Sequence, residues 1–63
     1  MNFAETAVQN KRILLENDRS NYELNFSLFV SLINLGTIYF YKGMNEQAEE
    51  IANEAKDIKA DHL

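Results

Sequence analysis

The chain has 63 residues with no proline, two glycines and no cysteine, so it forms one domain at most and has neither disulfides nor thiolate metal sites to stabilise it. Its formal net charge is −4, and its six Lys and Arg residues are scattered, which disfavours nucleic-acid binding because phosphate contacts need a concentrated basic face. A domain this small buries only about 60% of the surface of its unfolded chain, so a partner chain is expected.

The first predicted helix spans roughly residues 3–17, where apolar residues recur at helical spacing. Asn2 is followed three residues later by Glu5, as in an N-cap with an acid in the first turn. The beginning of the chain carries no basic segment like that of a secretory signal peptide. We therefore expect a cytoplasmic protein.

The second predicted helix spans roughly residues 20–42. Ser20 and Glu23 have the spacing of a capping box, in which each side chain accepts a hydrogen bond from a backbone amide of the first turn. Lys42 and Gly43 fit the other end, because a glycine readily takes the left-handed conformation that closes a helix. No residue between Leu24 and Tyr41 is charged.

The third predicted helix spans roughly residues 44–60, with Asn45 as its N-cap. Six acidic residues and only two lysines follow residue 43, so the whole net charge lies on this helix. Five of the acidic residues recur at helical spacing and form an acidic stripe: Glu46, Glu50, Glu54, Asp57 and Asp61. A solvated face is the first reading of this stripe, docking against a basic partner is the second, and a metal cage is the least favoured.

Together these signals predict an all-α protein with three helices in a single domain over residues 1–63. The second helix is apolar nearly all round its axis, and its neighbours can cover only part of a rod about 34 Å long. Another chain is expected to cover the rest, in the first instance a second copy that makes a homodimer. The residues expected at the partner or dimer interface are Leu28, Phe29, Leu32, Ile33, Phe40 and Tyr41.

A single membrane span is an alternative reading of the same helix, because about 20 apolar residues cross a bilayer. Asn25 and Asn34 are costly in lipid, and the flanking segments show no clear asymmetry of Lys and Arg. These features disfavour a membrane span.

The second half of the chain resembles one tetratricopeptide repeat. The resemblance covers residues 29–62 and rests on the Leu-Gly pair followed by a tyrosine, on a glycine at the turn, and on small residues spaced along the last helix. It implies an antiparallel helical hairpin preceded by one further helix. The residues expected to pack this hairpin are Leu35, Gly36, Tyr39, Gly43, Ala48, Ala52 and Ala55.

In such a hairpin, Gly36 allows the next helix to approach closely and Tyr39 fills the space between the paired helices. The chain departs from the family pattern at Leu32, Ala52 and Ala60, which stand where a tryptophan-like residue, an aromatic residue and a proline are usual. Three or more stacked repeats normally bury a continuous core. A single repeat therefore implies a fragment of a longer repeat protein, a degenerate minimal relative of the family, or a unit that dimerisation completes.

No enzymatic site is expected. The only histidine, His62, stands next to the end of the chain, where it is expected to be solvated, with a metal only if another chain adds ligands. No phosphate-binding glycine loop is present, and no cofactor or metal is expected. The sequence thus favours a protein-interaction module that binds and regulates a protein partner, with a structural subunit of a larger helical assembly as the alternative.

Overall fold

The computed structural model describes residues 3–63, which form three α-helices and, within that range, no strand. The helices are α1 (Phe3–Asn17), α2 (Tyr22–Tyr41) and α3 (Asn45–His62). The prediction of an all-helical chain is confirmed. The expected N-cap Asn2 lies outside the described residues.

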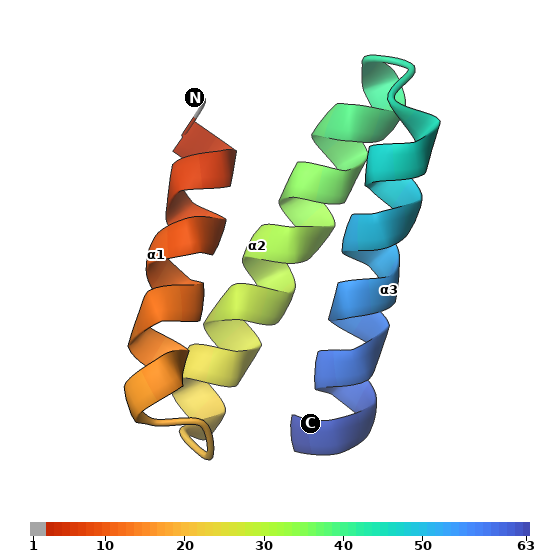
Figure 1. Cartoon of the computed structure of the whole chain (residues 1–63). Helices are drawn as coiled ribbons and strands as arrows, with labels where there is room; N and C mark the ends of the chain where they lie inside the picture. Colours follow the sequence, from red (N-terminus) through yellow and green to blue (C-terminus); the bar gives the residue numbers. More distant parts are fainter. Residues whose placement is uncertain (1–2) are drawn as a thin grey trace.

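The long helix α2 runs between α1 and α3 and is antiparallel to both (Figure 1). Among the described residues, Cα atoms of α2 lie within 8 Å of both other helices, whereas none of α1 lies that close to α3. The molecule is a slab, with principal extents of 33 × 24 × 13 Å. The two neighbours therefore cover one side of α2, and the other side is left open.

Asn21, and not Ser20, is the N-cap of α2. Its side chain accepts a hydrogen bond of 3.0 Å from the amide of Leu24, and it donates one of 2.9 Å to Asp18. Asn25, only 3% exposed, donates from one amide nitrogen to the carbonyl oxygens of Arg19 and Asn21, each at 2.9 Å. The predicted N-cap at Ser20 is therefore wrong by one residue: Asn21 caps the helix, and α2 begins at Tyr22.

The end of α2 follows the predicted glycine signal. Gly43 has φ +77°, its amide donates to the carbonyl of Phe40 at 3.1 Å, and the amide of Met44 donates to the carbonyl of Tyr39 at 2.9 Å. This pair of bonds is the Schellman motif that closes many helices. The predicted cap at Asn45 is wrong: α3 begins after Met44, whose side chain makes no capping hydrogen bond.

The core lies on the covered side of α2. Leu28, Leu32 and Leu35 follow one another at helical spacing of four and three, so they share one face. Leu32 is 0% exposed and touches the centre of the cluster. The buried apolar residues are Val8 of α1, Leu28, Leu32 and Leu35 of α2, and Ala55 and Ile58 of α3.

Replacing the two glycines with alanine is expected to change the free energy of unfolding in opposite directions. A Cβ at Gly36 would meet Cγ2 of Ile51 at 3.4 Å, an ordinary contact, so Gly36→Ala should raise the free energy of unfolding by up to about 1 kcal/mol through helix propensity. Gly43→Ala should lower it by about 1–2 kcal/mol, because φ is positive there. Urea denaturation of both variants tests this, and destabilisation by both would contradict the alanine-sized space at Gly36.

Candidate protein-binding surface

The side of α2 that faces away from the core is apolar and exposed. Its residues follow one another at spacings of four, four, three and seven, with Tyr41 beside the last of them, and this places them on one face of the helix. We call them the α2 apolar face: Tyr22, Phe26, Val30, Ile33, Phe40 and Tyr41. Their exposed fractions run from 42% at Val30 to 83% at Tyr41, so the chain itself covers less than two thirds of any of them.

The aromatic rings on this face touch one another at both ends of the helix. The rings of Tyr22 and Phe26 stack with centroids 6.4 Å apart, and those of Phe40 and Tyr41 meet edge to face at 6.0 Å. The four rings are 62%, 50%, 66% and 83% exposed. With roughly 200 Å² per aromatic side chain they present about 500 Å², which is near the upper end for the largest apolar patch of a typical monomer.

An apolar groove of about 320 Å³ lies on the same side, between α2 and α3. Gly36 has no side chain to fill this space, and α3 adds only the methyl groups of Ala48 and Ala52 there. The groove is lined by Leu32, Ile33, Gly36, Thr37, Phe40, Tyr41, Ala48 and Ala52. It offers a bulky apolar side chain of another molecule a place to insert.

The structure divides the six residues expected at the interface. Leu28 and Leu32 are 3% and 0% exposed, so we remove them from the expected interface, because the contact with α1 and α3 already uses them. Phe29 is half-buried and packs against the core. Ile33, Phe40 and Tyr41 belong to the exposed face.

Sequence reasoning missed Tyr22, Phe26 and Val30, the other half of the face. Counting back from Ile33 in steps of three and four would have found all three. The signal was hidden because α2 carries apolar residues in nearly every direction. Only the positions of α1 and α3 separate the face that is covered from the face that is not.

The residues expected to pack the hairpin also have different positions. Leu35 and Ala55 are buried, Ala48 is half-buried, and Gly36 lies against Ile51 of α3. Ala52 is exposed beside the apolar groove, which corrects its expected place between the helices.

Tyr39 faces α1 through its ring and hydroxyl group. Burial raises the pKa of this phenol, the negative charge of Glu5 and a hydrogen bond to Glu5 raise it further, and the charge of Arg12 opposes them. Its expected role was to fill the space between α2 and α3. The structure instead brings it near two charged residues of α1.

Tyr39 gives a prediction for alkaline pH. Because its folded-state pKa lies above the unfolded value of about 10, the phenol contributes stability that is full below about pH 10 and is lost as pH rises through the folded-state pKa. The difference in free energy of unfolding between the wild type and Tyr39→Phe should therefore shrink above about pH 10. Denaturation between about pH 8 and pH 12 tests this, and a constant difference would contradict a raised pKa of Tyr39 in the folded chain.

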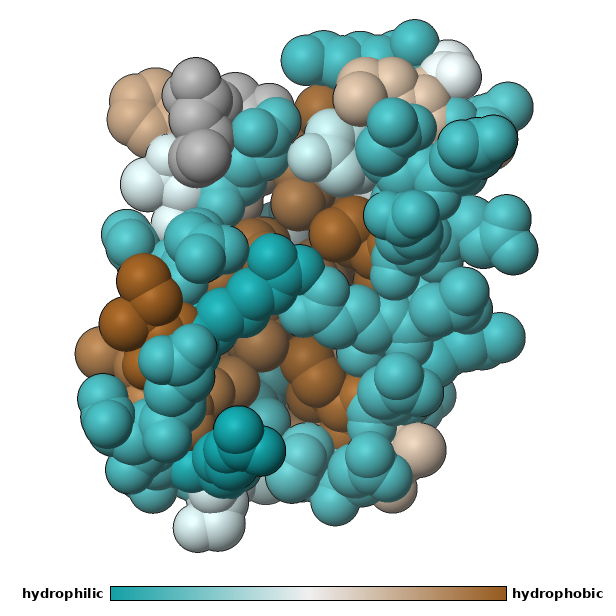
Figure 2. Space-filling view, in the orientation of Figure 1, coloured by the Kyte–Doolittle hydropathy of each residue, from teal (hydrophilic) through white to brown (hydrophobic). Residues whose placement is uncertain are grey.

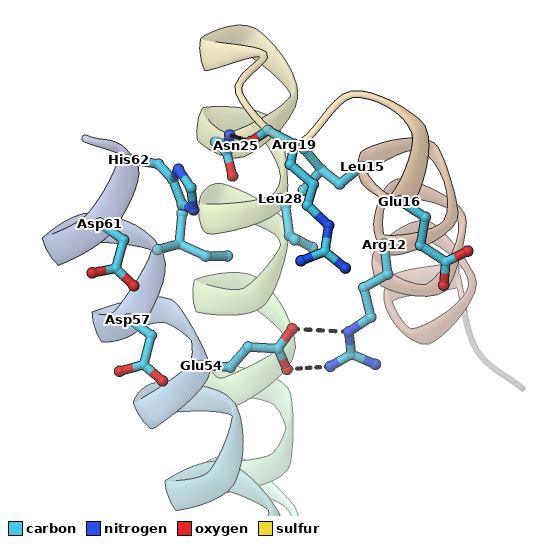
Figure 3. A pocket seen from close by; sticks show the side chains of 11 residues that line it. Arg12, Leu15, Glu16, Arg19, Asn25, Leu28, Glu54, Asp57, Asp61 and His62 are labelled. Carbon is cyan, nitrogen blue, oxygen red and sulfur yellow. Dashed lines mark hydrogen bonds and ion pairs between the residues drawn. The ribbon is translucent and has the colours of Figure 1, made fainter.

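On the opposite side of the slab, a second groove of about 430 Å³ runs between α1 and α3. Figure 2 shows this side, with apolar surface in a furrow between polar side chains. Leu15, Leu28 and Ile58 line the groove together with charged residues of α1 and α3. Figure 3 shows Arg12 reaching across it to Glu54.

Arg12 and Glu54 form a two-bond ion pair that joins α1 to α3. Nε of Arg12 donates to one carboxylate oxygen at 2.9 Å, and Nη2 donates to the other. This hydrogen bond is the main cause that raises the pKa of the Arg12 guanidinium. The pair closes the middle of the groove, although the two side chains remain 39% and 34% exposed.

The coupling energy of this pair should be small. A two-bond geometry favours the pair, but solvent screening at partly exposed side chains limits it to about 0.5–1 kcal/mol. A double-mutant cycle of Arg12→Ala and Glu54→Ala measures the coupling, which should decrease in 1 M salt. A coupling of zero at low salt would contradict the ion pair.

Three residues of the acidic stripe and His62 lie around the second groove. Glu54, Asp57, Asp61 and His62 line it, and His62 is in the last turn of α3 and exposed. Within residues 3–63, no three His, Cys, Asp or Glu side chains are arranged so that they could hold a metal ion. What the groove does offer is an apolar floor with charged residues around it.

By length and composition, α2 is also able to cross a membrane. It has 20 residues, and the 18-residue window with which it meets the criteria has a mean hydropathy of 1.4 and is 22% buried within the described structure. The core helix of a water-soluble protein meets the same criteria. The hydropathy of α2 therefore leaves both a protein and a lipid environment open for the α2 apolar face.

Comparison of the chain with protein-family models, with curated proteins and with solved structures finds no match in any of the three.

Proposed function

We propose that this chain is a small protein-interaction module that binds another protein chain through the α2 apolar face and thereby regulates it. One observation carries the proposal: six large apolar side chains, between 42% and 83% exposed, lie on one side of one helix. Contact with another chain would remove this surface from water, at about 25 cal/mol per Å².

The shape of the surface favours a protein over a small molecule as the ligand. Small-molecule sites enclose most of their ligand, whereas the α2 apolar face extends over the full length of a 20-residue helix and has only one open groove at its side. A helix laid along another helix meets such a surface with residues at spacings of three and four. We propose the cytoplasm as the location.

A photoreactive residue placed on the face tests the proposal in living cells. A benzophenone side chain at Ile33 should form covalent adducts with a protein chain on irradiation. The same group at Asn10, an exposed position on α1, is the control and should give few adducts. Equal yields at the two positions, or none at Ile33, would contradict a binding surface on α2.

We also propose that α2 and α3 form a tetratricopeptide-like hairpin. The contact of Gly36 with Ile51, the burial of Ala55 and the positive φ of Gly43 support it, while the outward position of Ala52 is a departure. Such a hairpin ordinarily stacks on further helices. This property is consistent with an apolar face that another chain covers.

The alternative is a structural subunit that uses the same α2 apolar face for contact with another chain but has no regulatory role. Its apolar face would be covered permanently, and the chain would fold only with its partner. Circular dichroism of the isolated chain separates the two proposals. A helical, cooperatively unfolding chain supports the module, and an unfolded chain that one partner rescues supports the structural subunit.

The second candidate is a membrane peptide. The length and the hydropathy of α2 support it. The buried Asn25 and the hydrogen bond from Lys11 to Ser31 place polar groups along α2, and polar groups are costly in lipid. Carbonate extraction distinguishes the two environments. A protein-interaction module should be released from membranes, whereas a spanning peptide should stay in the pellet.

A further inference from the structure

We propose that the chain covering the α2 apolar face is a second copy of this chain, packed antiparallel, and that Phe26 of each copy inserts into the apolar groove of the other. The inference rests on the proposed function, because it names the partner of the same surface. Three features carry it: the area of the face, the order of large and small residues along it, and the position of its charges.

The exposed area is what a dimer of small chains needs. The accessible surface of the chain is 4589 Å², about 400 Å² more than a folded monomer of 7.3 kDa usually exposes. The four aromatic rings present about 500 Å², and Val30 and Ile33, both nearly half exposed, add to it. The total approaches the roughly 800 Å² per partner of a specific protein interface.

The face has the spacing of a helix that packs along another helix. Phe26, Val30, Ile33, Thr37 and Phe40 follow at steps of four, three, four and three, which is the heptad pattern of the contact positions in coiled coils. A two-fold axis near the middle of α2 makes such a surface self-complementary, since each copy then meets the same residues of the other. The heptad spacing therefore suits a second α2.

An antiparallel arrangement matches large residues with small ones. It places Phe26 opposite the second copy's Thr37, beside the groove that Gly36 leaves open, and it places Val30 opposite the second copy's Ile33. A parallel arrangement would set Phe26 against Phe26 and Thr37 against Thr37, so the groove would stay empty. The antiparallel arrangement therefore has the lower free energy, because an unfilled groove in an interface loses dispersion contacts.

The charges favour the same arrangement. Exposed Glu23 near the beginning of α2 lies within about 3 Å along the axis of the second copy's Lys42 when the helices are antiparallel, whereas a parallel pair sets Glu23 against Glu23. Antiparallel helix dipoles also attract one another.

Three acidic side chains of α3 lie away from this interface. Glu54, Asp57 and Asp61 line the groove on the opposite side of the slab. On the side of α3 next to the α2 apolar face, helical spacing from Ala52 places Lys56 and Lys59 together with Glu49, so the two lysines outnumber the one carboxylate there. A second copy therefore approaches without bringing the two acidic stripes together, although the chain as a whole is negative.

Sedimentation and cysteine cross-linking test the proposal, because the chain has no cysteine of its own. The wild type should sediment as a dimer, and Phe26→Ala should weaken the dimer at least about a hundredfold, since each dimer loses two inserted rings. Phe3→Ala, at a 96% exposed position outside the face, should leave it unchanged. Circular dichroism confirms that both variants are folded.

Tyr22→Cys and Phe40→Cys then report the direction of the helices, because the antiparallel pairing sets these two positions opposite each other. Under mild oxidation, a mixture of the two variants should give a mixed disulfide at least about tenfold more readily than either variant alone gives its own. Disulfides of each variant with itself would overturn the antiparallel arrangement.

If the protein is a monomer at all concentrations, the proposal that a second copy covers the α2 apolar face is wrong. If benzophenone at Ile33 still captures a different protein in cells, the proposed function stands and only this inference falls. If it captures nothing, both fall.

Discussion

Replacing Ile33 with glutamate is expected to turn the dimer into a monomer and to abolish capture of any protein through α2, while the three helices stay folded. Ile33 is 47% exposed in the chain by itself, so a carboxylate there reaches water in the monomer. In the dimer each carboxylate would be buried against the second copy's Val30, close to the two-fold axis at the centre of the interface. An unpaired ion in such a place costs several kcal/mol, so the dissociation constant should rise at least about a thousandfold.

The matched control is Asn34→Glu, which adds the same charge at the next residue along α2. Asn34 is exposed and points about 100° away from Ile33 around the helix. Sedimentation equilibrium measures the dissociation constants, and circular dichroism measures the helix content. Equal weakening by both substitutions would indicate a general charge effect, and no weakening by Ile33→Glu would remove Ile33 from the interface.

Replacing Leu32, the residue before Ile33, should unfold the chain instead of separating two folded copies. Leu32 is 0% exposed and packs in the cluster that joins all three helices. Truncation of a buried leucine to alanine costs about 2–5 kcal/mol, whereas a chain of 63 residues has about 3–9 kcal/mol of stability in total. Leu32→Ala should therefore lose most or all of the cooperative unfolding transition.

Ile33→Ala is the matched control for this second effect, because it removes a similar volume from a half-exposed side chain. It should cost less than about 1 kcal/mol in the monomer. Thermal unfolding by circular dichroism at one fixed low concentration compares the two variants. Similar losses at Leu32 and Ile33 would contradict the assignment of one position to the core and its neighbour to the exposed face.

The sequence predicted the helices well because local signals determine them. The span of α1 and the glycine that ends α2 depend on contacts within one or two turns. The start of α2 was misplaced because Ser20 and Asn21 are both good N-cap residues, and the choice between them depends on Asn25. Its side chain bonds back to the turn from inside the structure, which a capping rule does not contain.

The surface was only half predictable for a different reason. The absence of charge between Leu24 and Tyr41 indicates that α2 needs more cover than two short helices give. It does not tell which side they cover, because the apolar residues of α2 point nearly all round. Leu28 and Leu32 were assigned to a partner and belong to the core, whereas Tyr22, Phe26 and Val30 were left out and are exposed.

The ion pair between Arg12 and Glu54 had no signal in the sequence at all. The two residues are 42 positions apart, and the contact depends on how α1 and α3 lean toward each other over α2. Glu54 was assigned to a solvated acidic stripe, and nothing nearby in the sequence distinguishes it from Glu50 or Asp57. Contacts of this kind follow from the fold and are found only once it is known.

The central claim is that another chain covers the α2 apolar face, and oxidative footprinting of the protein inside cells tests it most directly. Hydroxyl radicals oxidise exposed aromatic rings, and Phe3, 96% exposed and outside the face, is the internal reference. We predict that Tyr22, Phe26 and Phe40 are oxidised at least several times more slowly, relative to Phe3, than their exposed fractions of 62%, 50% and 66% require. Oxidation in proportion to those fractions would show an uncovered face and would contradict the proposed function.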